Sequence, residues 1–220
     1  MNSFLELKKI SKTFTTEKTV RVLKNLSQQF NKGKSYAIMG PSGSGKSTLL
    51  NLISLIDRPS SGSIKFNKIQ VNFDESEKND IFRSKKIGIV YQQNNLLPDF
   101  TALENIYLAS LAINDNKELA ISNAKKLLKQ ISLSNRADHF PSQLSGGEAQ
   151  RVAIARAIVN NPEIILADEP TGSLDMETAK DIFELLNKQK RSDRIIIFAT
   201  HNRFFANKAD CLLEMIDGSI

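Results

Sequence analysis

The chain has 220 residues and only one cysteine, Cys211, so an internal disulfide is excluded. It also lacks long apolar runs, since no window approaches the roughly 18 apolar residues that indicate a membrane-spanning helix. The first residues, MNSFLELKKI, contain no apolar signal-peptide core and no small-residue cleavage site. These absences predict a cytoplasmic protein without a membrane span of its own.

Negative charge is in the minority, with 24 Asp and Glu against 30 Lys and Arg and a formal net charge of +6. A basic balance is compatible with a nucleic acid or an anionic membrane surface as partner. The lysines are nevertheless scattered through segments such as KELAISNAKKLLKQ instead of forming a block. A solvated lysine-rich surface explains this excess, and charge alone selects no partner.

A glycine-rich stretch lies between a short apolar run, YAIM, and the apolar segment LLNLISLI. Its residues are Gly40, Pro41, Ser42, Gly43, Ser44, Gly45, Lys46, Ser47 and Thr48. They satisfy the P-loop pattern G-x-x-x-x-G-K-[ST] between an expected strand and an expected helix. Gly43 and Gly45 allow backbone N–H groups to converge on phosphate oxygens, Lys46 supplies positive charge, and the Ser47 hydroxyl can ligate Mg²⁺. The stretch therefore predicts a nucleoside triphosphate site, the alternative being a chance glycine-rich turn.

Two further apolar runs, IILA at residues 164–167 and IIIFA at 195–199, are typical of strands buried in a parallel sheet. A helical pattern from about 176 to 190 separates them. Asp168 follows the first run and is positioned to hold Mg²⁺, which leaves Glu169 to act on an attacking water. Many strands end in an acidic residue, so the assignment of Asp168 and Glu169 is weak alone. The presence of the P-loop pattern in the same chain supports it.

The remaining elements have weaker patterns. We expect half-buried strands at residues 4–10 and 20–30, with a polar loop over 11–17 that carries Phe14. Short strands are expected at 63–66, 88–91 and 212–215, and helices within 96–131 and 148–159.

Ser145, Gly146 and Gly147 precede the last of these helices. Together they offer a hydroxyl, exposed N–H groups and a helix N-terminus, which is a second anion-binding device. A plain serine N-cap would explain Ser145 but not two consecutive glycines, which weaken a helix. One nucleotide already has its phosphates in the P-loop, so this device calls for a second nucleotide or a second chain.

The segment LSGGEAQR at residues 144–151 resembles the signature motif of ABC-transporter ATPase subunits. Gln92 resembles the Q-loop residue of that family, Ser173–Asp175 the D-loop, and His201 the H-loop histidine. Phe14 stands where the family has an aromatic that stacks on adenine. The resemblance covers residues 4–218, while His139 matches no motif and is expected to be a surface or structural histidine.

The resemblance implies an α/β fold, a P-loop NTPase of the ABC ATPase type. Its mostly parallel sheet core would be joined by an N-terminal antiparallel β part and an α-helical subdomain. The chain would be a single domain over residues 1–220. Its nucleotide-binding core would comprise 1–92 and 160–220, and its helical subdomain about 93–159.

The same resemblance implies a head-to-tail dimer that binds ATP and Mg²⁺ between two copies. Each ATP would lie between the P-loop of one copy and Ser145, Gly146 and Gly147 of the other, with Asp175 communicating across the dimer. Glu169 would polarise the attacking water and His201 would contact the γ-phosphate. Ser47, Asp168 and Gln92 would surround the metal.

Residues 91–105, YQQNNLLPDFTALEN, are similar to the lipoprotein-releasing LolD family. That family implies two separate permease subunits of the LolC/LolE kind, a peripheral position on the cytoplasmic face of the inner membrane, and no nucleic acid partner. Two departures are TGSLD in place of the more usual TGNLD, and Phe14 in place of a tyrosine. Neither removes a chemical group that the mechanism needs.

Several alternatives stay open. MacB-type exporters and the cell-division ATPase FtsE share NLLP and LEN with this chain. A soluble ABC ATPase acting on nucleic acid or ribosomes would typically carry a long coiled-coil arm, for which the roughly 50 residues between Gln92 and Ser145 are too few. A small-molecule kinase would share the P-loop but has no use for LSGGE.

Overall fold

The structure is a computed structural model that describes residues 4–15, 19–113 and 115–220. The chain divides into two compact units, one formed by residues 1–83 with 190–220 and the other by residues 84–189.

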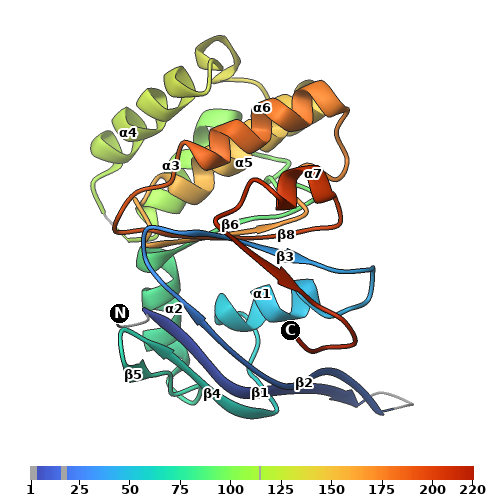
Figure 1. The fold of residues 1–220 in the computed structure, drawn as a ribbon. Helices are drawn as coiled ribbons and strands as arrows, with labels where there is room; N and C mark the ends of the chain where they lie inside the picture. The colour runs from blue at the N-terminus through green and yellow to red at the C-terminus, as the bar shows by residue number, and fades with distance from the viewer. Residues whose placement is uncertain (1–3, 16–18, 114) are drawn as a thin grey trace. The chain divides into compact units, whose positions relative to one another are not determined.

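An antiparallel sheet opens the first unit, with strand order β2 (Thr19–Phe30), β1 (Leu5–Thr15), β4 (Ser61–Phe66) and β5 (Ile69–Gln70) (Figure 1). The predicted loop over residues 11–17 is wrong for residues 11–15, which continue β1. Ser11 pairs with Ser61 and Thr13 with Arg21, so neighbouring strands hold this polar segment extended. Residues 16–18 lie outside the described residues.

Three parallel strands form the other sheet of this unit, with β3 (Ser35–Met39) between β8 (Ile195–Thr200) and β9 (Cys211–Glu214). Every residue of β8 is buried, as its apolar run predicts. Helix α1 (Lys46–Ile53) follows β3, and the short α7 (Arg203–Ala206) follows β8. Met39 pairs with Thr200, so the segments beginning at Gly40 and His201 leave the same edge of the sheet.

Two helices were not predicted from the sequence, the four-residue α7 and α2 (Ser76–Lys86). Helix α2 has no buried residue and therefore no apolar face that a sequence pattern could reveal.

In the second unit β6 (Ile87–Val90) and β7 (Ile164–Asp168) form a parallel pair. Val90 pairs with Ala167, so the segments that carry Gln92 and Asp168 also leave one common edge. A Cβ on Gly88 would lie 2.2 Å from the carbonyl oxygen of Ala157. The absence of a side chain at Gly88 thus lets β6 approach the backbone of the helix that contains Ala157.

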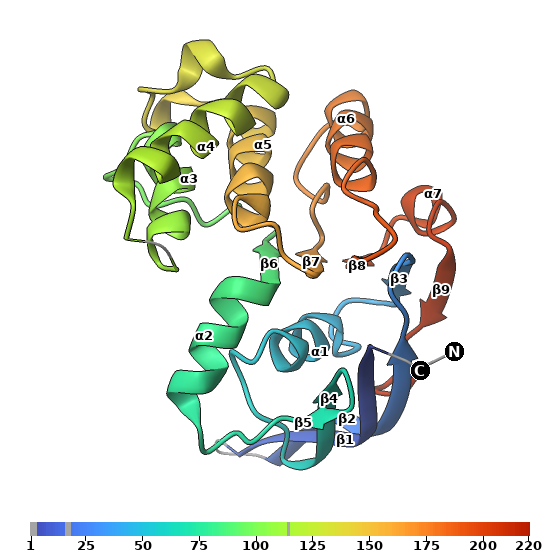
Figure 2. The same ribbon diagram turned by 90° about the vertical axis from the view of Figure 1, so that its left-hand side faces the viewer.

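The helices of this unit are α3 (Ala102–Leu111), α4 (Lys117–Gln130), α5 (Gly146–Ile158) and α6 (Met176–Asn187), as Figure 2 shows. Two 3₁₀ turns, Ser134–Arg136 and Pro141–Gln143, lie between α4 and α5. The helical prediction for residues 96–131 is wrong at its start, because α3 begins only at Ala102. A Thr101–Glu104 capping box fixes that start.

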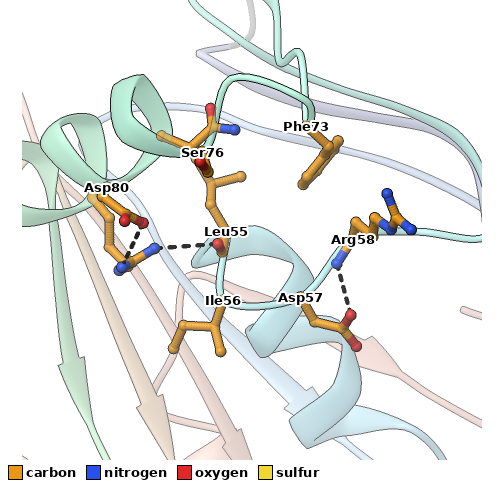
Figure 3. A pocket seen from close by; sticks show the side chains of 9 residues that line it. Leu55, Ile56, Asp57, Arg58, Phe73, Ser76 and Asp80 are labelled. Atoms are coloured by element: carbon orange, nitrogen blue, oxygen red, sulfur yellow. Dashed lines mark hydrogen bonds and ion pairs between the residues drawn. The ribbon is translucent and has the colours of Figure 1, made fainter.

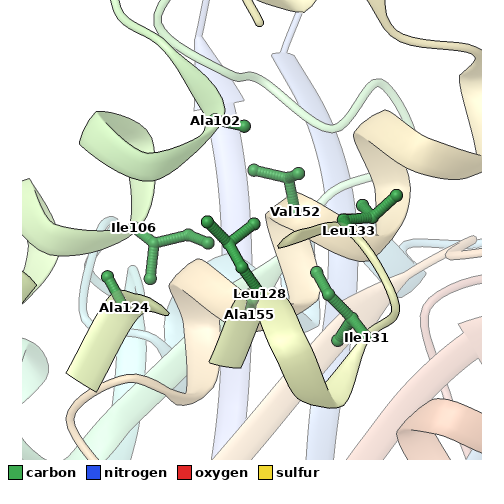
Figure 4. Close-up of a cluster of buried hydrophobic side chains, with 8 residues drawn as sticks. All are labelled: Ala102, Ile106, Ala124, Leu128, Ile131, Leu133, Val152 and Ala155. Atoms are coloured by element: carbon green, nitrogen blue, oxygen red, sulfur yellow. The ribbon is translucent and has the colours of Figure 1, made fainter. Parts of the chain in front are cut away.

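Helices α3, α4 and α5 share a buried apolar cluster (Figure 4). Its members are Ala102, Ile106, Ala124, Leu128, Ile131, Leu133, Val152 and Ala155. The predicted α/β class is confirmed, with an antiparallel β part, parallel strands and a helical region. None of the helices within the described residues is both long and apolar enough to cross a bilayer.

Candidate nucleotide-binding site

The P-loop connects β3 to α1 as predicted. Gly43 and Gly45 have φ of +80° and +105°, the left-handed region that glycine adopts without strain. Gly40 lies close to the backbone that follows β9, because a Cβ on Gly40 would be 2.2 Å from the carbonyl oxygen of Met215. Helix α1 starts at Lys46 with Gly45 as its N-cap and no side-chain cap. The helix N-terminus is therefore left available to an anion.

Two polar side chains of the loop, Ser44 and Lys46, are buried. Lys46 is only 7% exposed, and its Nζ donates to the carbonyl oxygens of Gly40 and Pro41 at 2.8 and 3.0 Å. Within the described residues, Ser44 Oγ is buried without a hydrogen-bond partner. Because a buried hydroxyl normally has a partner, this atom favours a ligand in the loop.

Two other predicted residues belong to the first unit. His201 is exposed directly after β8, and Asn202 caps α7 by accepting a hydrogen bond from the Phe204 N–H. Phe14 lies in β1 opposite Val20 and is 42% exposed. The Lys12 ammonium lies 4.8 Å from the Phe14 ring centroid and is held by the Asp57 carboxylate at 2.6 Å. The Lys12 ammonium therefore packs against the Phe14 ring by a cation–π contact, while part of the ring stays open to solvent.

In the second unit Asp168 ends β7 and is half-buried. Glu169 follows with a φ of +46°, an unusual backbone conformation for a glutamate. The Gly172 N–H donates to the Glu169 carbonyl at 3.0 Å, which closes a tight turn. A Cβ on Gly172 would lie 3.1 Å from Nε2 of Gln92. The structure therefore brings Gln92 against the turn that begins at Glu169.

The segment Ser145–Gly147 forms the start of α5. The Ser145 hydroxyl accepts from the Glu148 N–H at 3.2 Å, and the Glu148 carboxylate accepts from the Ser145 N–H at 2.8 Å. This bond from the Ser145 backbone is the main reason that the pKa of Glu148 is lowered. Ser145 is therefore an N-cap, as the simpler interpretation expected. Across the described residues the N–H groups of Gly146 and Gly147 make no hydrogen bond, so both remain available.

Asp175 caps α6 by accepting hydrogen bonds from the N–H groups of Glu177 and Thr178 at 3.1 and 3.0 Å. Hydrogen bonds from Thr178, first from its side chain and then from its backbone, lower the Asp175 pKa. The residue expected to communicate between copies thus also has a local structural role.

The predicted residues fall into two groups. Residues 40–48, Phe14 and His201 belong to the first unit. Gln92, Ser145–Gly147, Asp168, Glu169 and Asp175 belong to the second.

A separate surface pocket of about 350 Å³ lies in the first unit (Figure 3). Its lining is Leu55, Ile56, Asp57, Arg58, Phe73, Ser76, Asn79, Asp80 and Arg83. Charges in it are largely compensated, since Arg83 pairs with Asp80 at 2.8 Å and Asp57 binds Lys12. It contains none of the predicted site residues.

Sequence reasoning did not identify Gln150 and Arg156 of α5, which bind the backbone of the segment containing Gln92. The sequence signal was absent, because their partners are backbone carbonyls that any residue carries.

Comparison with known proteins agrees with this geometry. The sequence profile of the family described as ABC transporter matches residues 23–172. The chain belongs to the ABC transporter family. It is 44% identical to the "Lipoprotein-releasing system ATP-binding protein LolD" of Ehrlichia ruminantium (strain Gardel), across 100% of this chain and 97% of that protein. This family membership makes the chain an ATP-binding, ATP-hydrolysing cassette and confirms the predicted fold and enzyme class.

Two further relatives of this ABC cassette are informative. The "Macrolide export ATP-binding/permease protein MacB" of Mannheimia succiniciproducens is 41% identical over 99% of this chain but only 34% of its own length. A dimeric post-hydrolysis structure of the ATP-binding cassette MJ0796 bound to ADP and Pi is 40% identical, with a TM-score of 0.91. That match covers 98% of this chain and 96% of the other.

Proposed function

We propose that this cassette is the ATP-hydrolysing subunit of a transporter that releases lipoproteins from the inner membrane. The observation that carries the proposal is the end-to-end similarity to a lipoprotein-releasing LolD protein, at 44% identity. The P-loop with its open helix N-terminus supports the ATPase part independently, because it supplies backbone donors and a lysine for a triphosphate.

In this proposal residues 40–48 hold the phosphates and Phe14 stacks on the adenine. Ser47 and Asp168, with Gln92, hold Mg²⁺, for which hydroxyl and carboxylate oxygens are suitable ligands. In the described parts of the chain, no cluster of three or more His, Cys, Asp or Glu makes a complete metal cage. Mg²⁺ usually keeps waters and phosphate oxygens among its ligands, and when bound it would polarise the γ-phosphate.

Glu169 is the proposed general base. Its carboxylate takes a proton from water as the water oxygen bonds to the γ-phosphorus, while the bond from that phosphorus to the β–γ bridging oxygen breaks. ADP and phosphate are the products. The proposed role of His201 is a hydrogen bond to the γ-phosphate. Gln92 is placed in the proposal as the residue that orients Mg²⁺ and the water.

A second copy of the chain is proposed to complete the site with Ser145, Gly146 and Gly147. The two available N–H groups at the start of α5 support this role, since they and the helix dipole favour a phosphate. Asp175 would communicate between the copies. The dimeric MJ0796 cassette bound to ADP and Pi is a precedent in a relative.

The same proposal has membrane partners. Two separate permease subunits of the LolC/LolE kind would bind the dimer at the cytoplasmic face of the inner membrane, where the cassette is peripheral. Residues 93–159 would act as a helical subdomain beside a core of 1–92 and 160–220, within one domain of 1–220.

The 41% identity to the cassette part of a MacB protein favours a second candidate, an exporter ATPase. The two are separated by purifying the chain with its membrane partners and incorporating them into liposomes with a labelled lipoprotein. ATP-dependent lipoprotein release, absent with Glu169→Gln, is the expected result. Export of a small molecule without lipoprotein release would favour the MacB-type function, and salt-sensitive binding to nucleic acid would contradict both.

A further inference from the structure

The segment after β6 is held to helix α5 at two places. The first is Tyr91, whose carbonyl oxygen accepts a hydrogen bond of 3.1 Å from Nε2 of Gln150. Gln150 is 2% exposed, so its side chain is held in one place by packing. This bond fixes the backbone immediately before Gln92.

The second place lies two residues beyond Gln92. Arg156 donates from Nη1 to the carbonyl oxygen of Asn95 and from Nη2 to that of Asn94, both at 2.7 Å. Asn95 has a φ of +48°, in the left-handed region that asparagine adopts more readily than most residues, and the guanidinium binds the carbonyl of this residue. A planar guanidinium can hold two neighbouring carbonyl oxygens at once, which a lysine ammonium cannot do with the same geometry.

The Arg156 side chain is not explained by charge pairing. All its hydrogen bonds within the described residues go to carbonyl oxygens, and burial lowers its pKa. Arg156 is partly buried, and partial burial of a guanidinium carries a desolvation cost that an apolar side chain at this position would avoid. This cost favours a purpose for the two bonds beyond filling space.

Between the two attachments Gln92 and Gln93 are exposed. The Gln92 amide faces the turn after Glu169, where a Cβ on Gly172 would approach its Nε2 to 3.1 Å. A shift of the backbone at Tyr91 or Asn94 would therefore move the Gln92 amide relative to Glu169.

We propose that Gln150 and Arg156 are positioning residues that hold Gln92 in its catalytic orientation beside Glu169. The inference rests on the proposed role of Gln92 toward Mg²⁺ and water. Helix α5 also carries Ser145–Gly147 at its start, so one rigid element supports both the phosphate-binding segment and the Gln92 loop.

The test is a double-mutant cycle between Arg156→Lys and Gln92→Ala in the full-length chain. We measure kcat for ATP, the Mg²⁺ concentration that gives half-maximal rate, and the affinity for a non-hydrolysable ATP analogue. Arg156→Lys keeps the charge, and we expect it to lower kcat by about 10- to 100-fold through misplacement of Gln92. We also expect it to raise the Mg²⁺ requirement and to leave analogue affinity within about twofold, because the P-loop is untouched.

In the Gln92→Ala background Arg156→Lys should slow the reaction by less than about twofold, because nothing remains to be positioned. Equal slowing in both backgrounds would overturn the inference and leave Arg156 a purely structural role. If Gln92→Ala itself hydrolyses ATP normally, the proposed role of Gln92 fails, and this result is distinguishable from failure of the positioning alone.

Two more variants keep the test decisive. Arg191→Lys is the matched control, because Arg191 lies in an exposed turn and pairs with Asp193 at 2.9 Å, and its kcat should be unchanged. If urea unfolding shows that Arg156→Lys does not fold, Gln150→Met replaces it in the same cycle. It removes the bond to Tyr91 while conserving length, and the same non-additivity with Gln92→Ala is expected.

Discussion

Substitution of Gly146 by alanine separates the structural and the phosphate-binding interpretations of the signature segment. Gly146 is the first residue of α5 and does not have a positive φ. A Cβ there would meet only Leu174 Cδ2, at an ordinary contact distance of 3.5 Å. Gly146→Ala should therefore fit the fold and change the free energy of unfolding by no more than about 1 kcal/mol, in the stabilising direction, since alanine favours helices over glycine.

The ATPase activity of Gly146→Ala should fall although its stability does not. If the Gly146 N–H binds a phosphate on a second copy, the added methyl group prevents close approach and removes one hydrogen bond to a charged group. Such a bond contributes about 1.5–3 kcal/mol, which corresponds to about a 10- to 160-fold fall in kcat/KM. We would measure ATPase rates beside urea unfolding of the nucleotide-free chain.

The neighbouring glycine supplies the matched comparison. A Cβ on Gly147 would lie 2.5 Å from Cγ2 of Thr178, so Gly147→Ala should lower stability by about 1–3 kcal/mol through overpacking. Thr178→Ser in that background removes the clashing methyl and should restore stability but not activity. A Gly146→Ala chain that is stable and hydrolyses ATP at the normal rate would refute the phosphate contact.

Four other substitutions test the general base, the P-loop lysine, the helical core and a helix cap. Glu169→Gln should leave ATP binding intact and slow hydrolysis by about 10²- to 10⁴-fold, as expected for loss of a general base; near-normal turnover would reassign the base. Lys46→Ala should abolish nucleotide binding in a titration, and retained affinity would contradict the role of Lys46. Leu128→Ala, at 1% exposure in the helical cluster, should lower the free energy of unfolding by about 2–5 kcal/mol in urea, whereas a change under 1 kcal/mol would contradict its packing. The pKa of Glu104 is lowered in the folded chain, mainly because its carboxylate accepts a hydrogen bond from the Thr101 backbone N–H. The stabilisation from Glu104 should therefore be complete above about pH 5 and be lost as pH falls through the folded pKa, so the stability difference from Glu104→Gln should shrink below about pH 4.

Features with a strong local cause could be predicted from the sequence. The P-loop conformation follows from glycines at positions that need positive φ, and β7 and β8 follow from continuous apolar runs. Helix α5 was also predicted from its apolar helical pattern, although it begins at Gly146, two residues before the expected start at 148. In each case the sequence signal lies within a few residues, although the partners of β7 and β8 are distant in sequence.

The remaining features depend on partners distant in sequence or on backbone groups. Residues 11–15 form a strand only because β2 and β4 pair with them, and α2 has no buried face to generate a pattern. The bonds from Gln150 and Arg156 end on carbonyl oxygens about 60 residues away, where the side-chain sequence has no influence on the acceptor. Such contacts become visible only once the chain is folded.

Each ATP site is proposed to need two copies of this chain, and the mass of the Glu169→Gln variant in solution shows whether two copies assemble. Slow hydrolysis in this variant should keep ATP bound long enough to observe the closed state. With saturating ATP and Mg²⁺, light scattering should give twice the 24.6 kDa mass of the monomer. Addition of Gly146→Ala should return the mass to that of the monomer. A variant that binds ATP fully by titration and still remains monomeric would contradict the shared site.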